Sequence, residues 1–229
     1  DAAELARERR EDALDLFPPE SGLREAVIAR FPETLVHAGP PAKAGRVQAW
    51  VVGPGLGDDE EAVHDVLASD VPVLVDADGL RLLDAAAVRD RDAPTLLTPH
   101  AGEAAALLGV PREEVESSRL ASVRELAARY GATALLKGST TLVAAPDGSR
   151  TPVRVNPMGT PWLATAGSGD VLSGLAGSLL AAGLEARDAG SAAAYLHGLA
   201  ARHAVAEGTP ITSYDVASAL PSAWRDVFH

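Results

Sequence analysis

The sequence contains no cysteine. This absence excludes disulfide bonds, thiolate catalysis and every metal site that uses cysteine ligands. Basic residues are also few, because 20 Lys and Arg stand against 32 Asp and Glu, which gives a formal net charge of -12. Nucleic acids and anionic membranes bind to basic surfaces, so neither is an expected partner. A ligand that carries phosphate must therefore be held by backbone N–H groups and single cations.

Long hydrophobic runs are absent as well. No stretch approaches the roughly 18 consecutive apolar residues of a membrane-spanning helix, and the charged start DAAELARERRED does not resemble a signal peptide. Hydrophobic residues nevertheless make up 47% of the chain, enough for a substantial core. With 229 residues, the chain suits one main domain. We therefore expect a cytoplasmic enzyme.

The first residues differ in composition from the rest of the chain. Residues 1–16 carry dense mixed charge, which predicts a solvated helix, and FPPE at 17–20 would break it. A second short helix is expected over residues 22–30. The sequence thus predicts a charged helical segment at 1–30 in front of a main domain at 31–229.

Short apolar runs that end in polar or glycine-rich turns recur along the main domain. They are VVGPGLG (51–57), VLVDADGL (73–80), TLLTPHAGE (95–103) and LLKGSTT (135–141). Strands that alternate with helices predict a parallel sheet covered on both faces. Residues 136–157 predict a hairpin with PDGS as its turn. Three further helices are expected over residues 170–182, 186–206 and 213–220.

Each of the four turns follows directly on an expected strand. Ligands of open α/β sheets bind beyond the carboxyl ends of the strands. The segments GPGLG, DADGL, TPHAGE and KGSTT are therefore expected to share one rim of the sheet and to form one site.

The stretch TAGSGDVLSGLAGSLLAAGL (165–184) places an ionisable carboxylate, Asp170, at the start of an almost wholly apolar helix. Gly167 and Gly169 allow a ligand to approach the N–H groups of the helix N-terminus, which favours phosphate binding. A carboxylate beside phosphate suits a general base that accepts a proton from a hydroxyl nucleophile. The alternative is that Asp170 and Ser168 only cap the helix.

The longest of these motifs resemble those of one enzyme family. NPMGTPWLATAGSGDVLSGLAGSLLAAGL (156–184), TLLTPHAGEAAALLG (95–109) and LLKGSTTLVAAPDG (135–148) are similar to segments of ADP- or ATP-dependent NAD(P)H-hydrate dehydratases. These are ribokinase-like proteins, often fused behind an epimerase domain. VVGPGLG, VLVDADGL and YLHGLAA agree in order and spacing, and the resemblance runs from about Phe31 to the C-terminus. It implies an α/β fold, the ribokinase-like three-layer sandwich with a mostly parallel central sheet between helices.

The resemblance also implies a set of site residues. Asp170 would be the catalytic acid/base next to the hydrated nicotinamide. The hydrated dinucleotide would contact Gly57, Thr98, Pro99, His100, Ala101, Gly102, Glu103 and Asp170. The phosphoryl-donating nucleotide would contact Lys137, Gly138, Ser139, Thr140, Thr141, Asn156, Gly167, Ser168 and Gly169. Glu103 stands where ribokinase-like folds place the glutamate that holds Mg²⁺ through water.

The implied activity is the repair of damaged cofactor. The S-forms of NADH hydrate and NADPH hydrate would be dehydrated to NADH and NADPH, with ADP or ATP hydrolysed to AMP or ADP and phosphate, in the presence of Mg²⁺. The family is commonly tetrameric, and apolar residues of 186–206 and 213–220, such as Ala193, Tyr195 and Leu196, favour a homotetramer. The alternatives are a kinase of the same fold for a thiazole or pyrimidine vitamin precursor, and an inactive nucleotide-binding domain.

The sequence departs from the family pattern at three places. Ala101 replaces a usual proline, and Met158 stands where NPTGTP is usual. The glycine-rich strand–loop–helix with which the family usually opens is not found in residues 1–30. Either the sequence is a piece of a longer chain or it skips residues here. If the segment is truly absent, the sheet loses strands from one edge, and activity is in doubt.

Simpler interpretations stand beside the functional ones. Lys137, one of two lysines, would be merely solvated, and His100 an ordinary loop histidine. Glu103 would belong to the first turn of a helix, where the dipole favours acidic residues. His197 on an apolar helix face predicts a packed, hydrogen-bonded core residue. The two aspartates of DADGL, Asp76 and Asp78, predict loop-capping groups. The alternative is that they contact a metal ion or the substrate.

Overall fold

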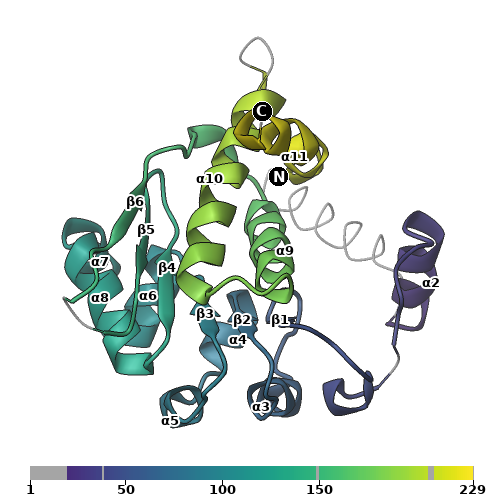
Figure 1. The fold of residues 1–229 in the computed structure, drawn as a ribbon, viewed down its shortest axis with the longest axis horizontal. Helices are drawn as coiled ribbons and strands as arrows, with labels where there is room; N and C mark the ends of the chain where they lie inside the picture. Colours follow the sequence, from purple (N-terminus) through teal and green to yellow (C-terminus); the bar gives the residue numbers. More distant parts are fainter. Residues whose placement is uncertain (1–19, 38, 148–149, 206–208, 229) are drawn as a thin grey trace, which may run out of the picture. The chain divides into compact units, whose positions relative to one another are not determined.

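The computed structural model describes residues 20–37, 39–147, 150–205 and 209–228 (Figure 1). The chain divides into two compact units, residues 1–44 and 45–229, which are described separately. The helix expected over residues 1–16 lies outside the described residues. The boundary expected between residues 30 and 31 stays a prediction.

The first unit contains one α-helix among its described residues. This helix, α2 (Glu20–Arg30), confirms the short helix expected at 22–30, and the 3₁₀ turn η1 (Pro41–Lys43) follows it. The large apolar side chains of Phe31 and Leu35 are exposed.

The second unit is built on a six-stranded sheet in the order β1-β2-β3-β4-β5-β6. The first four strands, which run parallel, are β1 (Trp50–Val52), β2 (Val73–Val75), β3 (Thr95–Leu97) and β4 (Thr133–Leu136). The last two, which pair antiparallel, are β5 (Thr141–Ala144) and β6 (Arg154–Asn156). Because the four parallel strands run in the same direction, their carboxyl ends lie at the same edge of the sheet, which forms the rim. The predicted mostly parallel sheet and the antiparallel strand pairing of the hairpin are confirmed, whereas Gly148 and Ser149 of the predicted PDGS turn lie outside the described residues.

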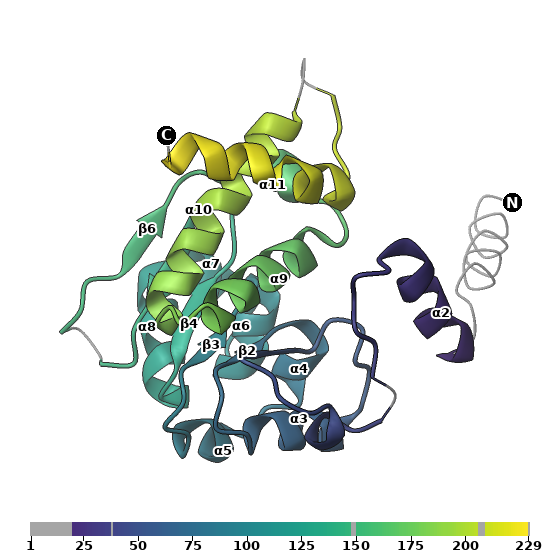
Figure 2. The same cartoon turned by 45° about the vertical axis from the view of Figure 1, so that its right-hand side comes forward.

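Helices cover both faces of this sheet (Figure 2). Alternate strand residues point to opposite faces, so Val73 and Val75 belong to one core cluster and Leu74 to the other. The first cluster packs against helices that include α3 (Glu60–Leu67), α4 (Ala77–Arg81), α5 (Ala85–Arg89), α6 (Ala101–Leu108), α7 (Arg112–Ser117) and α8 (Arg119–Tyr130). The second packs against α9 (Ser168–Ala181) and α10 (Ala186–Ala204). The three-layer α/β sandwich expected from the sequence is therefore confirmed.

The C-terminal helix is longer than expected. The sequence predicts a helix over 213–220, whereas α11 (Ser213–Phe228) continues through Pro221. A proline inside a helix removes one backbone hydrogen bond. The extension nevertheless buries Ala223 fully and pairs Asp226 with His203 of α10 at 2.7 Å, which offsets that loss.

The parallel strands end very close to one another at the rim. Gly53, directly after β1, has a φ of 127°, and a Cβ at this position would lie 1.7 Å from the backbone oxygen of Asp76 after β2. No side chain fits there, so VVGPGLG requires glycine at this point. The described helices include none with the length and apolarity needed to cross a bilayer.

Candidate active site

The four turn segments meet at the carboxyl rim of the sheet, as the sequence predicts. The Gly57 N–H donates to Asp78 Oδ2 at 3.0 Å, which joins GPGLG to DADGL. The Lys137 N–H donates to the Pro99 carbonyl at 2.8 Å, which joins KGSTT to TPHAGE. Asp78 therefore stabilises a neighbouring loop, in agreement with its expected capping role.

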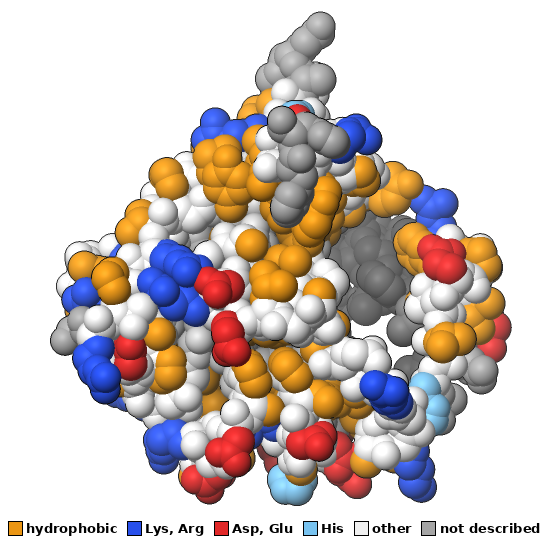
Figure 3. Space-filling view, viewed as in Figure 1, with side chains coloured by type: hydrophobic (Ala, Val, Ile, Leu, Met, Phe, Trp, Pro, Cys, Tyr) orange, Lys and Arg blue, Asp and Glu red, His pale blue; other side chains and the backbone are white. Residues whose placement is uncertain are grey.

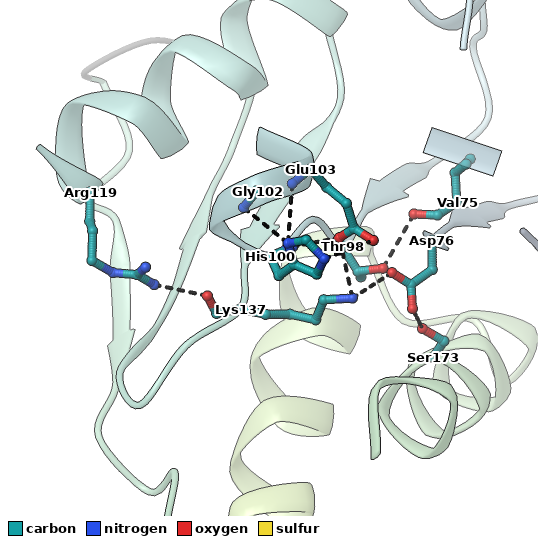
Figure 4. A network of polar contacts seen from close by, with 9 residues as sticks. All are labelled: Val75, Asp76, Thr98, His100, Gly102, Glu103, Arg119, Lys137 and Ser173. Carbon is teal, nitrogen blue, oxygen red and sulfur yellow. Dashed lines mark hydrogen bonds and ion pairs between the residues drawn. The ribbon is translucent and has the colours of Figure 1, made fainter. Parts of the chain in front are cut away.

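A partly buried ion pair lies at the centre of this rim (Figure 4). Lys137 Nζ donates to Asp76 Oδ1 at 2.6 Å, and Glu103 Oε2 lies 3.7 Å from the same nitrogen. Ser173 Oγ of α9 donates to Asp76 Oδ2 at 2.6 Å. Asp76 was expected to cap a loop, but its side chain makes no cap hydrogen bond to α4. Lys137 is 18% exposed, so the alternative of a merely solvated lysine is wrong.

His100 and Glu103 cap α6 together. His100 Nδ1 accepts from the N–H groups of Gly102 at 3.0 Å and Glu103 at 3.1 Å, and Glu103 Oε2 accepts from the His100 N–H at 2.7 Å. This reciprocal arrangement is a capping box. Because Nδ1 accepts, a neutral ring carries its proton on Nε2, which lies 3.5 Å from Glu103 Oε1. The ordinary-loop interpretation of His100 is therefore replaced by a helix-cap role.

The N-terminus of α9 is open to a ligand. Gly167 is its N-cap residue, with a φ of 79°, and no side chain makes a cap hydrogen bond there. Ser168 Oγ donates instead to the Leu163 carbonyl at 2.6 Å, and Asp170 is exposed in the first turn. The alternative in which Ser168 and Asp170 cap the helix is therefore wrong. The helix also begins at Ser168, two positions before the start expected at residue 170.

The positive end of α9 lies against the ion pair of Lys137 and Asp76. A Cβ built on Gly169 would lie 3.6 Å from Lys137 Nζ and 3.8 Å from Asp76 Oδ2. A helix N-terminus carries partial positive charge, and the ammonium group adds a full one. An anion bound at Gly169 would therefore meet both charges.

A cleft of about 650 Å³ opens on this end of α9. Of the predicted nucleotide-binding residues, those that line it are Lys137, Gly138, Ser139, Thr141, Asn156, Ser168 and Gly169. His100 and Ala101 line it too, whereas Gly102 and Glu103 line a neighbouring cavity of about 590 Å³ that also includes His100. Some of the predicted site residues line neither cavity. At the rim and in α9 these are Gly57, Thr98, Pro99 and Asp170, and in the loop before β5 it is Thr140. Gly167 likewise borders α9 without lining either.

One residue that shapes the cleft has no sequence motif. Arg119 Nη2 of α8 donates to the carbonyls of Leu136, Lys137 and Thr140 at 3.2, 3.1 and 3.1 Å. Burial lowers the pKa of its guanidinium from the ordinary value. These bonds fix the backbone of the loop after β4. A lone arginine in a helix gives no signal for such a role, because its partners lie 17 to 21 residues further along the chain.

The sequence model of the NAD(P)H-hydrate dehydratases matches residues 20–222. The chain belongs to this family.

Relatives at high identity agree with this membership. The bifunctional NAD(P)H-hydrate repair enzyme of Mycobacterium leprae is 52% identical over 189 residues, which cover 80% of this chain and 38% of that protein. The ADP-dependent (S)-NAD(P)H-hydrate dehydratase of Neisseria meningitidis is 47% identical over 186 residues, covering 77% and 62%. The chain thus spans less than two thirds of the length of these two relatives.

A solved structure has the same fold. The ADP/ATP-dependent NAD(P)H-hydrate dehydratase from Bacillus subtilis, co-crystallized with ATP/Mg²⁺, superposes with a TM-score of 0.71 at 32% identity. The match covers 81% of this chain and 68% of the Bacillus chain. The ribokinase-like architecture inferred from the motifs is thereby confirmed.

The side chain of His197 is buried, but one of its two ring nitrogens lacks the hydrogen bond that the sequence leads us to expect. Its side chain lines the 650 Å³ cleft, yet Nε2 has no hydrogen-bond partner among the described residues. Burial lowers the pKa of the ring to about 4; a hydrogen bond to the Ser168 backbone opposes this shift and the charge of Lys137 adds to it. The expectation of a hydrogen-bonded core histidine is therefore only half correct.

The lowered pKa of His197 predicts an acid-sensitive fold. Between the unfolded-state pKa of roughly 6.5 and the folded-state pKa of about 4, the unfolded chain binds more protons than the native one. Stability is therefore lost as the pH falls through this window, by roughly 3 kcal/mol at its lower end. Urea unfolding at pH 7 and at pH 4.5 would show a larger loss for the parent than for His197→Gln. Equal losses would contradict the assignment.

Proposed function

We propose that this chain catalyses the ADP-dependent dehydration of the S-forms of NADH hydrate and NADPH hydrate, with ATP as an alternative phosphoryl donor. The family and its named relatives support this proposal. The observation that carries it is the open N-terminus of α9. There the exposed carboxylate of Asp170 follows directly on Gly169, and a Cβ built on Gly169 would lie 3.6 Å from Lys137 Nζ.

In this proposal Asp170 accepts the proton of the hydrate hydroxyl while the hydroxyl oxygen attacks the terminal phosphoryl group of ADP. The bond from that phosphorus to the leaving oxygen breaks, and AMP carries the electron pair away. Lys137 and the N–H groups of α9 stabilise the charge that develops on the transferring group. Phosphate then leaves the ring with the C–O electron pair while the ring nitrogen donates its lone pair. Loss of a proton from the neighbouring carbon restores the double bond.

The donor set at the rim fits a magnesium ion held mainly by nucleotide phosphates. No group of three or more His, Asp or Glu side chains that could hold a metal occurs in the described residues. Mg²⁺ in phosphoryl-transfer sites usually takes one or two carboxylates and keeps several waters. The carboxylate of Glu103, with its side chain 21% exposed beside Lys137, is the one we propose for this role, through water. Bound there, Mg²⁺ would supply positive charge to the phosphates.

An assay with ADP, Mg²⁺ and enzymatically prepared NADH hydrate tests the proposed function. We expect the absorbance of reduced nicotinamide to recover only when nucleotide is present. Phosphate transfer to a panel of thiazole and pyrimidine alcohols, without this recovery, would instead show a kinase. Nucleotide binding without turnover of either kind would show an inactive binding domain.

The homotetramer and the cytoplasmic location expected from the sequence stay predictions. Hydrophobic side chains gather over α10 and α11 (Figure 3), and those of Tyr195, Tyr214 and Trp224 are exposed. Ala193 and Leu196, which supported the expected assembly, are buried within the chain itself, however. The apolar surface of these two helices is therefore smaller than the sequence indicates.

A further inference from the structure

Asp76 is almost completely buried, with 1% of its surface exposed, and both of its carboxylate oxygens are used. Oδ1 accepts from Lys137, which follows β4, and Oδ2 accepts from Ser173 of α9, each at 2.6 Å. One carboxylate thus joins the ends of two strands to the helix that carries Asp170.

The backbone of Asp76 is held as firmly as its side chain. Its N–H donates to the Val52 carbonyl and its carbonyl accepts from the Gly79 N–H, both at 3.0 Å. Gly53 packs so closely against that carbonyl oxygen that not even a Cβ would fit between them. The carboxylate is therefore a fixed point, whereas the partner it binds is a lysine with a flexible four-carbon side chain.

The second partner of Lys137 among the described residues lies further away. Glu103 Oε2 is 3.7 Å from Nζ, compared with 2.6 Å for Asp76 Oδ1. Without the Asp76 charge the ammonium group would be free to turn toward Glu103 or the cleft. It would then no longer be fixed beside Gly169, where the phosphoryl group is expected to bind.

We propose that Asp76 is a positioning residue that holds the Lys137 ammonium group against the N-terminus of α9. Its fixed negative charge weakens the binding of nucleotide phosphates but orients the cation for the transfer step. Preorganised charge stabilises a transition state because no reorganisation is needed during the reaction. This proposal rests on the proposed function. It adds that the charge of Asp76 lowers the affinity for the nucleotide but raises the rate of phosphoryl transfer.

The test is Asp76→Asn, which keeps the size of the side chain and removes its charge. We expect turnover of NADH hydrate to fall about 3- to 10-fold, while the dissociation constant of ADP stays the same or falls by up to about 10-fold. Adenosine, which has no phosphate, should bind equally to parent and variant. ADP and adenosine weakened in parallel, together with a lowered melting temperature, would show a purely structural role and overturn the proposal.

Ser173→Ala is the matched control, because it removes the second hydrogen bond of Asp76 but leaves both charges in place. It should not tighten ADP binding. Asp76→Asn combined with Lys137→Met provides a second test that also serves if the single variant does not fold. Turnover of this double variant should equal that of Lys137→Met within about twofold, because Asp76 acts through the lysine. A further loss of turnover would contradict this.

The two proposals fail in different ways. A parent chain that binds ADP but never dehydrates the hydrate would refute the proposed function. In that case the dissociation constants of ADP and adenosine, compared between the parent and Asp76→Asn, would still decide whether the charge of Asp76 acts on the bound phosphates.

Discussion

Replacing Asp170 with asparagine should lower the rate of hydrate dehydration by about 10²- to 10⁴-fold, the usual contribution of a general base. Asparagine has the same size and hydrogen-bonding reach but does not accept the proton. Asp170 is exposed and makes no cap hydrogen bond, so the melting temperature should hardly change. ADP should bind as tightly or more tightly, because one negative charge near the phosphates is gone.

Asp188 provides a matched control for this experiment. It occupies the third position of α10, as Asp170 does in α9, and it pairs with Arg154 at an exposed site that lines neither rim cavity. Asp188→Asn should leave the dehydration rate unchanged within about twofold, since exposed ion pairs contribute little. An Asp170→Asn variant that turned over within about threefold of the parent would exclude the general-base role.

The second large effect is expected for Lys137→Met. Loss of the only ammonium group at the rim among the described residues should raise the Michaelis constant for ADP by about 100-fold and lower turnover by only about 10-fold. The substitution also leaves the buried carboxylate of Asp76 without its cation, which costs about 3–5 kcal/mol of stability. Steady-state kinetics with varied ADP and a thermal melt measure both effects.

Asp76→Asn in the same chain should restore much of the lost stability, because it removes the unpaired buried charge. An ADP constant unchanged by Lys137→Met would place the nucleotide away from this lysine.

The sequence predicts the rim well because local patterns determine it. Apolar runs followed by glycine or polar turns define the strand ends, and parallel strands bring those ends together without further information. Gly167 and Gly169 before an apolar helix likewise predict the open anion site at α9. The hairpin of β5 and β6 follows from the turn signal in PDGS.

The missed roles depend on contacts between distant residues. Asp76 pairs with a lysine 61 residues further along the chain, and DADGL by itself does not indicate this pairing. Arg119 is similar, since its carbonyl partners belong to a later loop. The sequence shows that His197 lies on an apolar face, but not that packing leaves Nε2 without a partner. Pro221 suggests a helix end, whereas burial of Ala223 and the pairing of Asp226 with His203 explain why α11 continues.

In the proposed function, nucleotide hydrolysis drives dehydration at the N-terminus of α9. The most direct measurement follows phosphate release and the recovery of reduced nicotinamide together, in one reaction with ADP, Mg²⁺ and NADH hydrate. We expect equal amounts of the two products, no phosphate release without hydrate, and a parallel fall of both rates in Asp170→Asn. Phosphate released at the same rate with or without hydrate, and no recovered nicotinamide, would contradict the proposed function.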